Sequence, residues 1–245
     1  MIISLKNGIW QAQCSLFDAL GLQTDRQEIL SLTGGGGKTT TIQKLQQELI
    51  IRKIFHCVST TTHIQYIYNE SFLGEPSLER FLDIYQKTGT VWMGEPISEE
   101  KIKAFPLEFY EEVIKTGAWL LLEADGAKHF PVKAPNENEP VLLPATTLVC
   151  NVYGLDGVGK PIRESCFRIQ EVTELLGKTE DQLLEENDLV LLAGSESGGR
   201  KLVGQRSYHV ILNKADDAER QNMAKRIGEK MKLRGIEQIH ITSWW

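Results

Sequence analysis

Four consecutive glycines, Gly34 to Gly37, constrain this chain more than any other feature of its sequence. They follow an apolar run at residues 28–33, which predicts a strand, and precede residues 39–52, whose pattern predicts a helix. Glycine adopts the positive φ angles that a tight turn needs, and it lets other groups approach the backbone closely. The order of strand, glycine loop and helix therefore indicates an α/β protein.

Short apolar runs and amphipathic stretches alternate along the rest of the chain. The runs are continuous, as in strands that are covered on both faces of a parallel sheet. We predict a single α/β domain over residues 1–245 with the three-layer P-loop NTPase fold, a mostly parallel, doubly wound sheet. Residues 128–161, which hold five of the eight prolines, are expected to form a functional loop region or an insertion. Strands are expected at residues 28–33, 53–64, 90–94, 118–126, 147–154, 188–194, 208–216 and 238–242, and helices at 39–52, 77–87, 98–115 and 218–232.

The composition narrows the functions that are open to the chain. A net charge of −6 argues against broad binding to nucleic acid, which requires clustered positive charge. Four scattered cysteines without a C-x-x-C pair indicate neither a disulfide framework nor a zinc site. The first residues do not resemble a signal peptide, and no apolar run is long enough to span a bilayer. We expect a cytoplasmic protein without a nucleic-acid or membrane partner.

The glycine loop has the composition of a phosphate-binding site. Backbone N–H groups of Gly34 to Gly37 can surround phosphate oxygens, and the positive end of the following helix dipole strengthens that attraction. Lys38 is expected to reach the β- and γ-phosphates of GTP or ATP, and the Thr39 hydroxyl is expected to bind Mg²⁺.

The loop departs from the full pattern G-x-x-x-x-G-K-[ST], because Leu32 stands where the first glycine is required. The G-x-G-G-x-G-K-T-T variant fits better. That variant has a signature lysine that can act across a dimer; Thr33 takes its place here, and a homodimer is left open. The alternative is a flexible glycine linker, against which the flanking strand and helix argue. The nucleotide-binding candidates are Gly34, Gly35, Gly36, Gly37, Lys38, Thr39 and Thr40.

Two carboxylates stand at the end of a later strand. Glu123 and Asp125 are two residues apart, so both face one side of an extended chain. One can hold a Mg²⁺-bound water and the other can orient the attacking group, which makes both candidate metal ligands and, with Lys38, candidate catalytic residues. The alternative is that either acid caps the turn that follows.

The strand expected at residues 53–64 ends in a threonine-rich stretch. In P-loop proteins that strand end often faces the γ-phosphate, so Thr61 and Thr62 are candidate sensors of the nucleotide. Threonine also favours strands through its shape alone, and both interpretations stay open.

The segment N-K-x-D, with Asn213, Lys214 and Asp216, follows a late strand. It resembles the guanine-selecting motif of GTP-binding proteins. A carboxylate accepts two hydrogen bonds and so matches the N1–H and the exocyclic amine of guanine, whereas adenine presents an acceptor there. Ser243, after the last strand, is a lesser candidate for the same base. The alternative is that Asp216 caps the helix expected at residues 218–232.

Five segments carry a resemblance to a known family: LTGGGGKTTT, STTTHI, LLLEADGAKHFPVKAPNENEPVLLP, NVYGLDGVGKPI and ILNKADD. In this order, over about residues 31–243, they resemble the YqeC-type selenium-dependent hydroxylase accessory proteins. The resemblance implies a P-loop protein that assists the maturation of molybdenum hydroxylases with a selenium-dependent cofactor. A hydroxylase or a cofactor-assembly protein would be its partner. The resemblance adds Lys133 and Asp156 as candidate site residues; for both, a charged surface loop is the alternative.

Three functions are compatible with these patterns. The first is an NTPase, with GTP favoured over ATP because of the N-K-x-D segment. The second is a small-molecule kinase, whose acceptor site would lie in residues 128–161. The third is a nucleotide-bound scaffold without useful turnover, because neither a glutamine nor an arginine stands out as a catalytic trigger.

Overall fold

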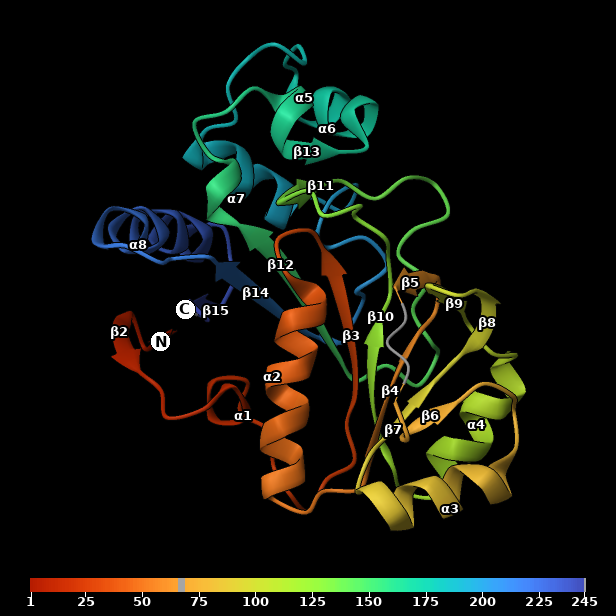
Figure 1. The fold of residues 1–245 in the computed structure, drawn as a ribbon. Helices are drawn as coiled ribbons and strands as arrows, with labels where there is room; N and C mark the ends of the chain where they lie inside the picture. Colours follow the sequence, from red (N-terminus) through yellow and green to blue (C-terminus); the bar gives the residue numbers. More distant parts are fainter. Residues whose placement is uncertain (66–68, 245) are drawn as a thin grey trace.

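The computed structural model describes residues 1–65 and 69–244 and has an α/β architecture (Figure 1). Its centre is a ten-stranded sheet with the order β2-β1-β15-β14-β12-β3-β10-β4-β7-β6. All neighbours from β15 to β6 are parallel, whereas β1 and β2 form an antiparallel edge. The predicted α/β class with a mostly parallel sheet is therefore confirmed.

The strands of the central sheet are β1 (Ile2–Lys6), β2 (Ile9–Ala12), β3 (Ile29–Gly34), β4 (His56–Thr60), β6 (Phe72–Leu73), β7 (Val91–Met93), β10 (Trp119–Glu123), β12 (Leu148–Gly154), β14 (Ser207–Asn213) and β15 (Gln238–Thr242). A small antiparallel sheet consists of β5 (His63–Gln65), β8 (Glu95–Ser98) and β9 (Lys101–Lys103). A parallel pair is formed by β11 (Val132–Lys133) and β13 (Cys166–Phe167).

Helices cover both faces of the central sheet. Alternate residues of β3 and β12 point to opposite faces, and all of β3 and β12 is buried. One face packs on α1 (Leu16–Ala19) and α2 (Lys38–Ile51). The opposite face packs on α3 (Leu78–Thr88), α4 (Leu107–Lys115), α6 (Ile169–Leu176), α7 (Glu186–Gly194) and α8 (Ala218–Leu233). Two short elements, the 3₁₀ turn η1 (Leu155–Gly157) and α5 (Ile162–Ser165), connect β12 to this layer.

The strand predicted at residues 188–194 is wrong, because this segment is helix α7. Its start is stabilised by a capping box, in which Glu185 and Asp188 each accept a hydrogen bond from the backbone of the other. Asp188 also pairs with Lys178. A short apolar run does not by itself distinguish a buried strand from a buried helix. Here the capping residues Glu185 and Asp188 favour the helix.

Two other predicted segments have different bounds in the structure. The single strand expected at residues 53–64 is divided between β4 and β5, and the first part of the helix expected at 98–115 forms β8 and β9 instead. The N-terminal hairpin of β1 and β2 was not predicted. Within the described residues, no helix has the length and apolarity that crossing a membrane requires.

Two histidines lie in a buried chain of hydrogen bonds between β14 and β15. His209 Nδ1 is 2.9 Å from His240 Nε2, and the hydroxyls of Ser207 and Ser4 lie within 3.0 Å of the outer ring nitrogens. Each neutral imidazole has one donor and one acceptor, so two neutral rings satisfy the whole chain. Burial lowers the pKa of His209 to about 4 and holds the pKa of His240 well below its usual value.

Mild acid should therefore destabilise the protein. Below pH 6.5 the unfolded chain binds protons at His209 and His240 that the folded protein does not bind, so the free energy of unfolding falls toward pH 5. We expect a slope of up to ~1.4 kcal/mol per pH unit for each histidine, measured by urea unfolding. His240→Gln should reduce the slope, and His129→Asn, at an exposed histidine, should not. Equal slopes in all three proteins would contradict this assignment.

Candidate functional site

The glycine loop lies at the carboxyl end of β3, in the middle of the sheet, and leads directly into α2 (Figure 1). Two of its N–H groups donate to neighbouring backbone: Gly35 N is 3.0 Å from Val152 O, and Gly36 N is 3.1 Å from Phe130 O. Gly36 has a φ of 69°, and a Cβ atom at this position would lie 2.1 Å from the nitrogen of Gly154. No other residue fits there without moving β12.

No side chain caps the backbone N–H donors at the start of α2. Gly37, with a φ of 113°, is the N-cap; it has no side-chain capping bond, and the first turn contains no acidic residue. The first N–H groups of a helix have no partner within the helix, and the helix dipole adds positive potential there. This helix terminus is therefore suited to an anion.

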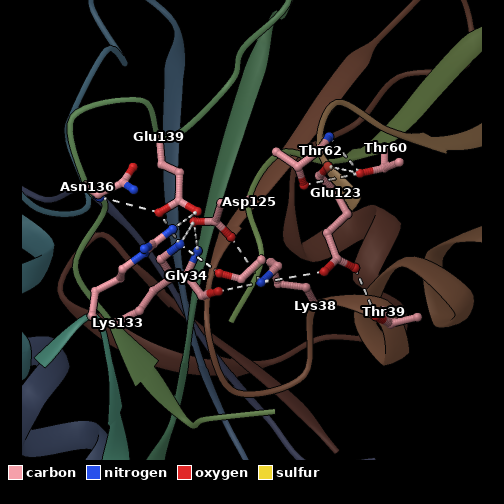
Figure 2. A network of polar contacts seen from close by, with 12 residues as sticks. Gly34, Lys38, Thr39, Thr60, Thr62, Glu123, Asp125, Lys133, Asn136 and Glu139 are labelled. Atoms are coloured by element: carbon pink, nitrogen blue, oxygen red, sulfur yellow. Dashed lines mark hydrogen bonds and ion pairs between the residues drawn. The ribbon is translucent and has the colours of Figure 1, made fainter. Parts of the chain in front are cut away.

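Lys38 lies between two carboxylates (Figure 2). Its Nζ is 3.0 Å from Asp125 Oδ1 and 3.7 Å from Glu123 Oε1, and it also donates to the carbonyl of Gly34. The residue is only 4% exposed. Burial alone would lower the pKa of Lys38, but Asp125 and Glu123 outweigh it and raise this pKa. Lys38 is therefore charged and fully paired in this structure.

Glu123 connects the end of β10 to the first turn of α2. Its Oε2 accepts a hydrogen bond of 2.9 Å from the Thr39 hydroxyl. Burial raises the pKa of Glu123, and the nearby Lys38 opposes that shift only in part. Asp125 lies on the other side of Lys38 (Figure 2), and its Oδ2 accepts from Gly34 N at 3.0 Å. The two predicted metal ligands on β10 thus face different partners: Glu123 faces Thr39, and Asp125 faces the loop.

The threonines at the end of β4 differ in their roles. Thr60, which the sequence analysis did not single out, donates to the carbonyl of Glu123 at 2.9 Å and accepts from Thr62 N at 3.0 Å. Thr61 is buried, and its hydroxyl donates to Val141 O. Thr62 lies beside Thr60 near Glu123 (Figure 2). Of the two predicted sensors, Thr62 is therefore the one at the polar site.

Lys133, predicted only from the family resemblance, extends the polar cluster beyond Asp125. Its Nζ lies 3.4 Å from Asp125 Oδ2, 2.8 Å from Glu139 Oε2 and 2.8 Å from Gly126 O. Glu139 also pairs with Arg168 at 3.4 Å. Burial alone would raise the pKa of Glu139, but the hydrogen bonds from Lys133 and Arg168 lower it overall. Arg168 was not predicted, because only the fold brings it to Glu139.

We call these six side chains the charge network. Acidic and basic side chains alternate along it. Their spatial order is Glu123, Lys38, Asp125, Lys133, Glu139 and Arg168.

The N-K-x-D segment reaches the glycine loop from β14. Asn213 Nδ2 donates to Gly36 O at 2.7 Å, so this side chain supports the loop. Lys214 Nζ lies 2.8 Å from Asp156, which brings these two predicted residues together.

Asp216 is exposed and accepts a hydrogen bond of 2.7 Å from Ser243, another predicted candidate. The N-cap of α8 is its neighbour Asp217, whose side chain accepts from Arg220 N at 2.8 Å. The capping alternative that the sequence left open for Asp216 therefore applies to Asp217.

The loop is closed around Lys38. The adjoining cavity, lined by Thr33, Asn151 and Lys133 among others, has a volume of about 10 Å³, which suits one water-sized group. Thr33 Oγ1 and Asn151 Oδ1 have no hydrogen-bond partner in the described residues.

The cysteines contribute nothing to this cluster. Burial raises the pKa of Cys166 to about 12 and raises the pKa values of Cys57 and Cys150 as well, so these three are structural thiols. Cys14 is exposed.

These features define an α/β protein with a glycine loop and a buried charge network at the carboxyl edge of its parallel strands. The chain belongs to the YqeC protein family, whose model matches residues 30–170. It is 25% identical over 233 residues to "Uncharacterized protein YqeC" of Escherichia coli (strain K12), an alignment that covers 92% of this chain and 89% of the relative. The family match includes the glycine loop and the charge network, but the N-K-x-D segment lies outside it.

Proposed function

We propose that this protein binds a Mg²⁺–nucleoside triphosphate at the glycine loop and hydrolyses it. The observation that carries the proposal is the position of Lys38, a buried cation at an uncapped helix terminus, directly after four glycines. A lysine there can exchange its carboxylate partners for phosphate oxygens, and the free N–H groups of α2 can bind the same anion.

The residues around Thr39 fit a magnesium ion. Mg²⁺ in nucleotide sites takes one or two protein oxygens, and phosphates and water complete its shell. The Thr39 hydroxyl and a Glu123 oxygen lie 2.9 Å apart, at the end of the helix where the phosphates would bind. No group of three or more His, Cys, Asp or Glu side chains suited to a metal exists in the described residues, so the nucleotide itself would supply the remaining ligands. Bound Mg²⁺ would neutralise charge on the phosphates.

The topology supports a P-loop NTPase fold for this chain. The strand that carries the loop, β3, lies in the middle of the sheet. Its neighbour β10 ends in the two carboxylates, and β12 and β14 on the other side lead to Asp156 and to the N-K-x-D segment. On this proposal the phosphates and the base would bind along one edge of the sheet, which is where ligands bind in open α/β folds.

Guanine is the base that the N-K-x-D segment favours. Asp216 keeps one carboxylate oxygen turned to Ser243, and it does not serve as the helix cap. We therefore favour GTP over ATP.

The family resemblance supports a role for this hydrolysis in the maturation of selenium-dependent molybdenum hydroxylases. A kinase that phosphorylates a cofactor precursor and a non-hydrolysing scaffold are the competing functions, and they differ in turnover. A kinase requires an acceptor, an NTPase releases phosphate without one, and a scaffold binds nucleotide only.

The test combines binding and turnover. Fluorescent GTP and ATP are titrated with and without Mg²⁺, and phosphate release is then followed with no acceptor added. Glu123→Gln should lose the effect of Mg²⁺ on binding, and its turnover should fall by about 100-fold. The same variant keeps an oxygen that can accept from the Thr39 hydroxyl, so the site should stay folded, as a thermal midpoint would show.

The matched control is Glu137→Gln, which removes an exposed acid in the 128–161 segment and should change nothing. Failure of the wild type to bind either nucleotide would refute the proposed function. Phosphate transfer only in the presence of an acceptor would identify a kinase instead.

A further inference from the structure

The middle of the charge network contains one carboxylate between two lysines. Asp125 is 2% exposed; its Oδ1 is 3.0 Å from Lys38 Nζ, and its Oδ2 is 3.4 Å from Lys133 Nζ. Gly34 N also donates to Oδ2. A buried carboxylate is tolerated only with a cationic or hydrogen-bonding partner, and Asp125 has a lysine on each side, each of them shared with a second acid.

Nucleotide binding would remove one of these two partners. To reach a polyphosphate, Lys38 has to give up present acceptors, because its three N–H donors already face Asp125, Glu123 and the carbonyl of Gly34. The step that concerns Asp125 is the one in which Lys38 exchanges this carboxylate for a phosphate oxygen. Without a second cation, this step would leave a negative charge uncompensated in the protein interior. The step is therefore feasible only if another positive group stays next to Asp125.

We propose that Lys133 is this second cation: a positioning residue that neutralises Asp125 and thereby frees Lys38 for the triphosphate. This inference rests on the proposed function. It assigns Lys133 no contact with the nucleotide.

The contacts of Lys133 hold its side chain in place. Its side chain is 1% exposed, and its three N–H donors have three acceptors, the carbonyl of Gly126 and the carboxylates of Glu139 and Asp125. The backbone of Lys133 pairs with Phe167 in the β11–β13 ladder, and Arg168 holds Glu139 from the opposite side. Lys38, by contrast, is the first residue of α2, at a helix start that no side chain caps and that can take up an anion. Of the two lysines, Lys133 is the fixed one and Lys38 the exchangeable one.

The test is a double-mutant cycle on the affinity for a non-hydrolysable GTP analogue, with Lys133→Met, Asp125→Asn and the double variant. Lys133→Met should weaken binding about 30-fold where residue 125 is aspartate, because Lys38 is then needed to neutralise Asp125. In the Asp125→Asn background the same change should weaken binding less than 3-fold, because residue 125 then carries no charge that Lys38 has to neutralise. Lys133→Arg should bind within a few-fold of the wild type.

Lys128→Met is the matched control: Lys128 lies in the same segment, and its ammonium group is 5.4 Å from the Phe167 ring, close to the 5.6 Å of Lys133. It should bind as the wild type does. Circular dichroism and a thermal midpoint show whether each variant is folded. If Lys133→Met does not fold, Lys133→Gln, which removes the charge but keeps a hydrogen-bond donor, replaces it in the two backgrounds.

Two results would overturn the inference: equal losses from Lys133→Met in both backgrounds, or no loss in the wild-type background while GTP still binds. The absence of any binding to the wild-type protein would instead refute the proposed function, so the two failures are distinguishable.

Discussion

Lys38→Ala should reduce the affinity for GTP and ATP at least 100-fold and abolish phosphate release. Lys38 is the only cation that the loop itself provides, and a charge-assisted contact to phosphate in a water-poor site is among the strongest polar interactions in proteins. The measurement is a titration with fluorescent nucleotide, followed by a phosphate-release assay.

The substitution also has a cost in stability. Without Lys38, Asp125 and Glu123 lose a cationic partner in a buried position, and we expect a loss of about 3 kcal/mol. Binding is therefore measured well below the thermal midpoint of the variant. The control is Lys44→Ala, at a half-buried lysine further along α2, which should have normal affinity. Turnover that survives in folded Lys38→Ala would remove the glycine loop from the active site.

Asp216→Asn should change the preferred base from guanine to xanthine. The carboxylate of Asp216 accepts from two adjacent donors of guanine, whereas an amide offers one acceptor and one donor. Xanthine has a carbonyl in place of the exocyclic amine of guanine and so matches the amide. We expect GTP to bind about 100-fold more weakly and xanthosine triphosphate to bind correspondingly better, measured by competition against the fluorescent analogue.

Asp217→Asn is the control for this experiment. Asp217 caps α8, and asparagine is an equally good cap, so neither the helix nor the base preference should change. Asp216→Ala should simply lose the preference for guanine. Equal competition by ATP and GTP in the wild type would show that Asp216 does not read the base.

The local sequence was sufficient to predict most strands, and also the strand and the helix that flank the glycine loop. The strand at residues 28–33, the loop and the helix at 39–52 correspond to β3 and α2 within one or two residues, because continuous apolar runs and glycine are strong local signals. The run at 188–194 was misassigned, because it is too short to carry a helical period and its helix depends on caps around Glu185. The edge hairpin of β1 and β2 was not predicted.

The residues of the candidate site also fall into two groups, those that the sequence predicts and those that it does not. Lys38, Thr39 and Glu123 were identified from residue type and from position at strand and helix ends, and the fold brings them within contact distance of one another. Lys133 entered only through resemblance to a family. Arg168 could not be found, because nothing in its neighbourhood in the chain indicates that it meets Glu139, 29 positions earlier.

Sequence alone determined that the chain forms a parallel α/β sheet and that a lysine follows a glycine turn at a helix start, since these features depend on neighbouring residues and on backbone freedom. Only the tertiary structure decided which charges meet. The alternation from Glu123 to Arg168 joins β10, α2, β11 and the start of α6, and the energy of a buried charge depends on whatever partners the fold places around it.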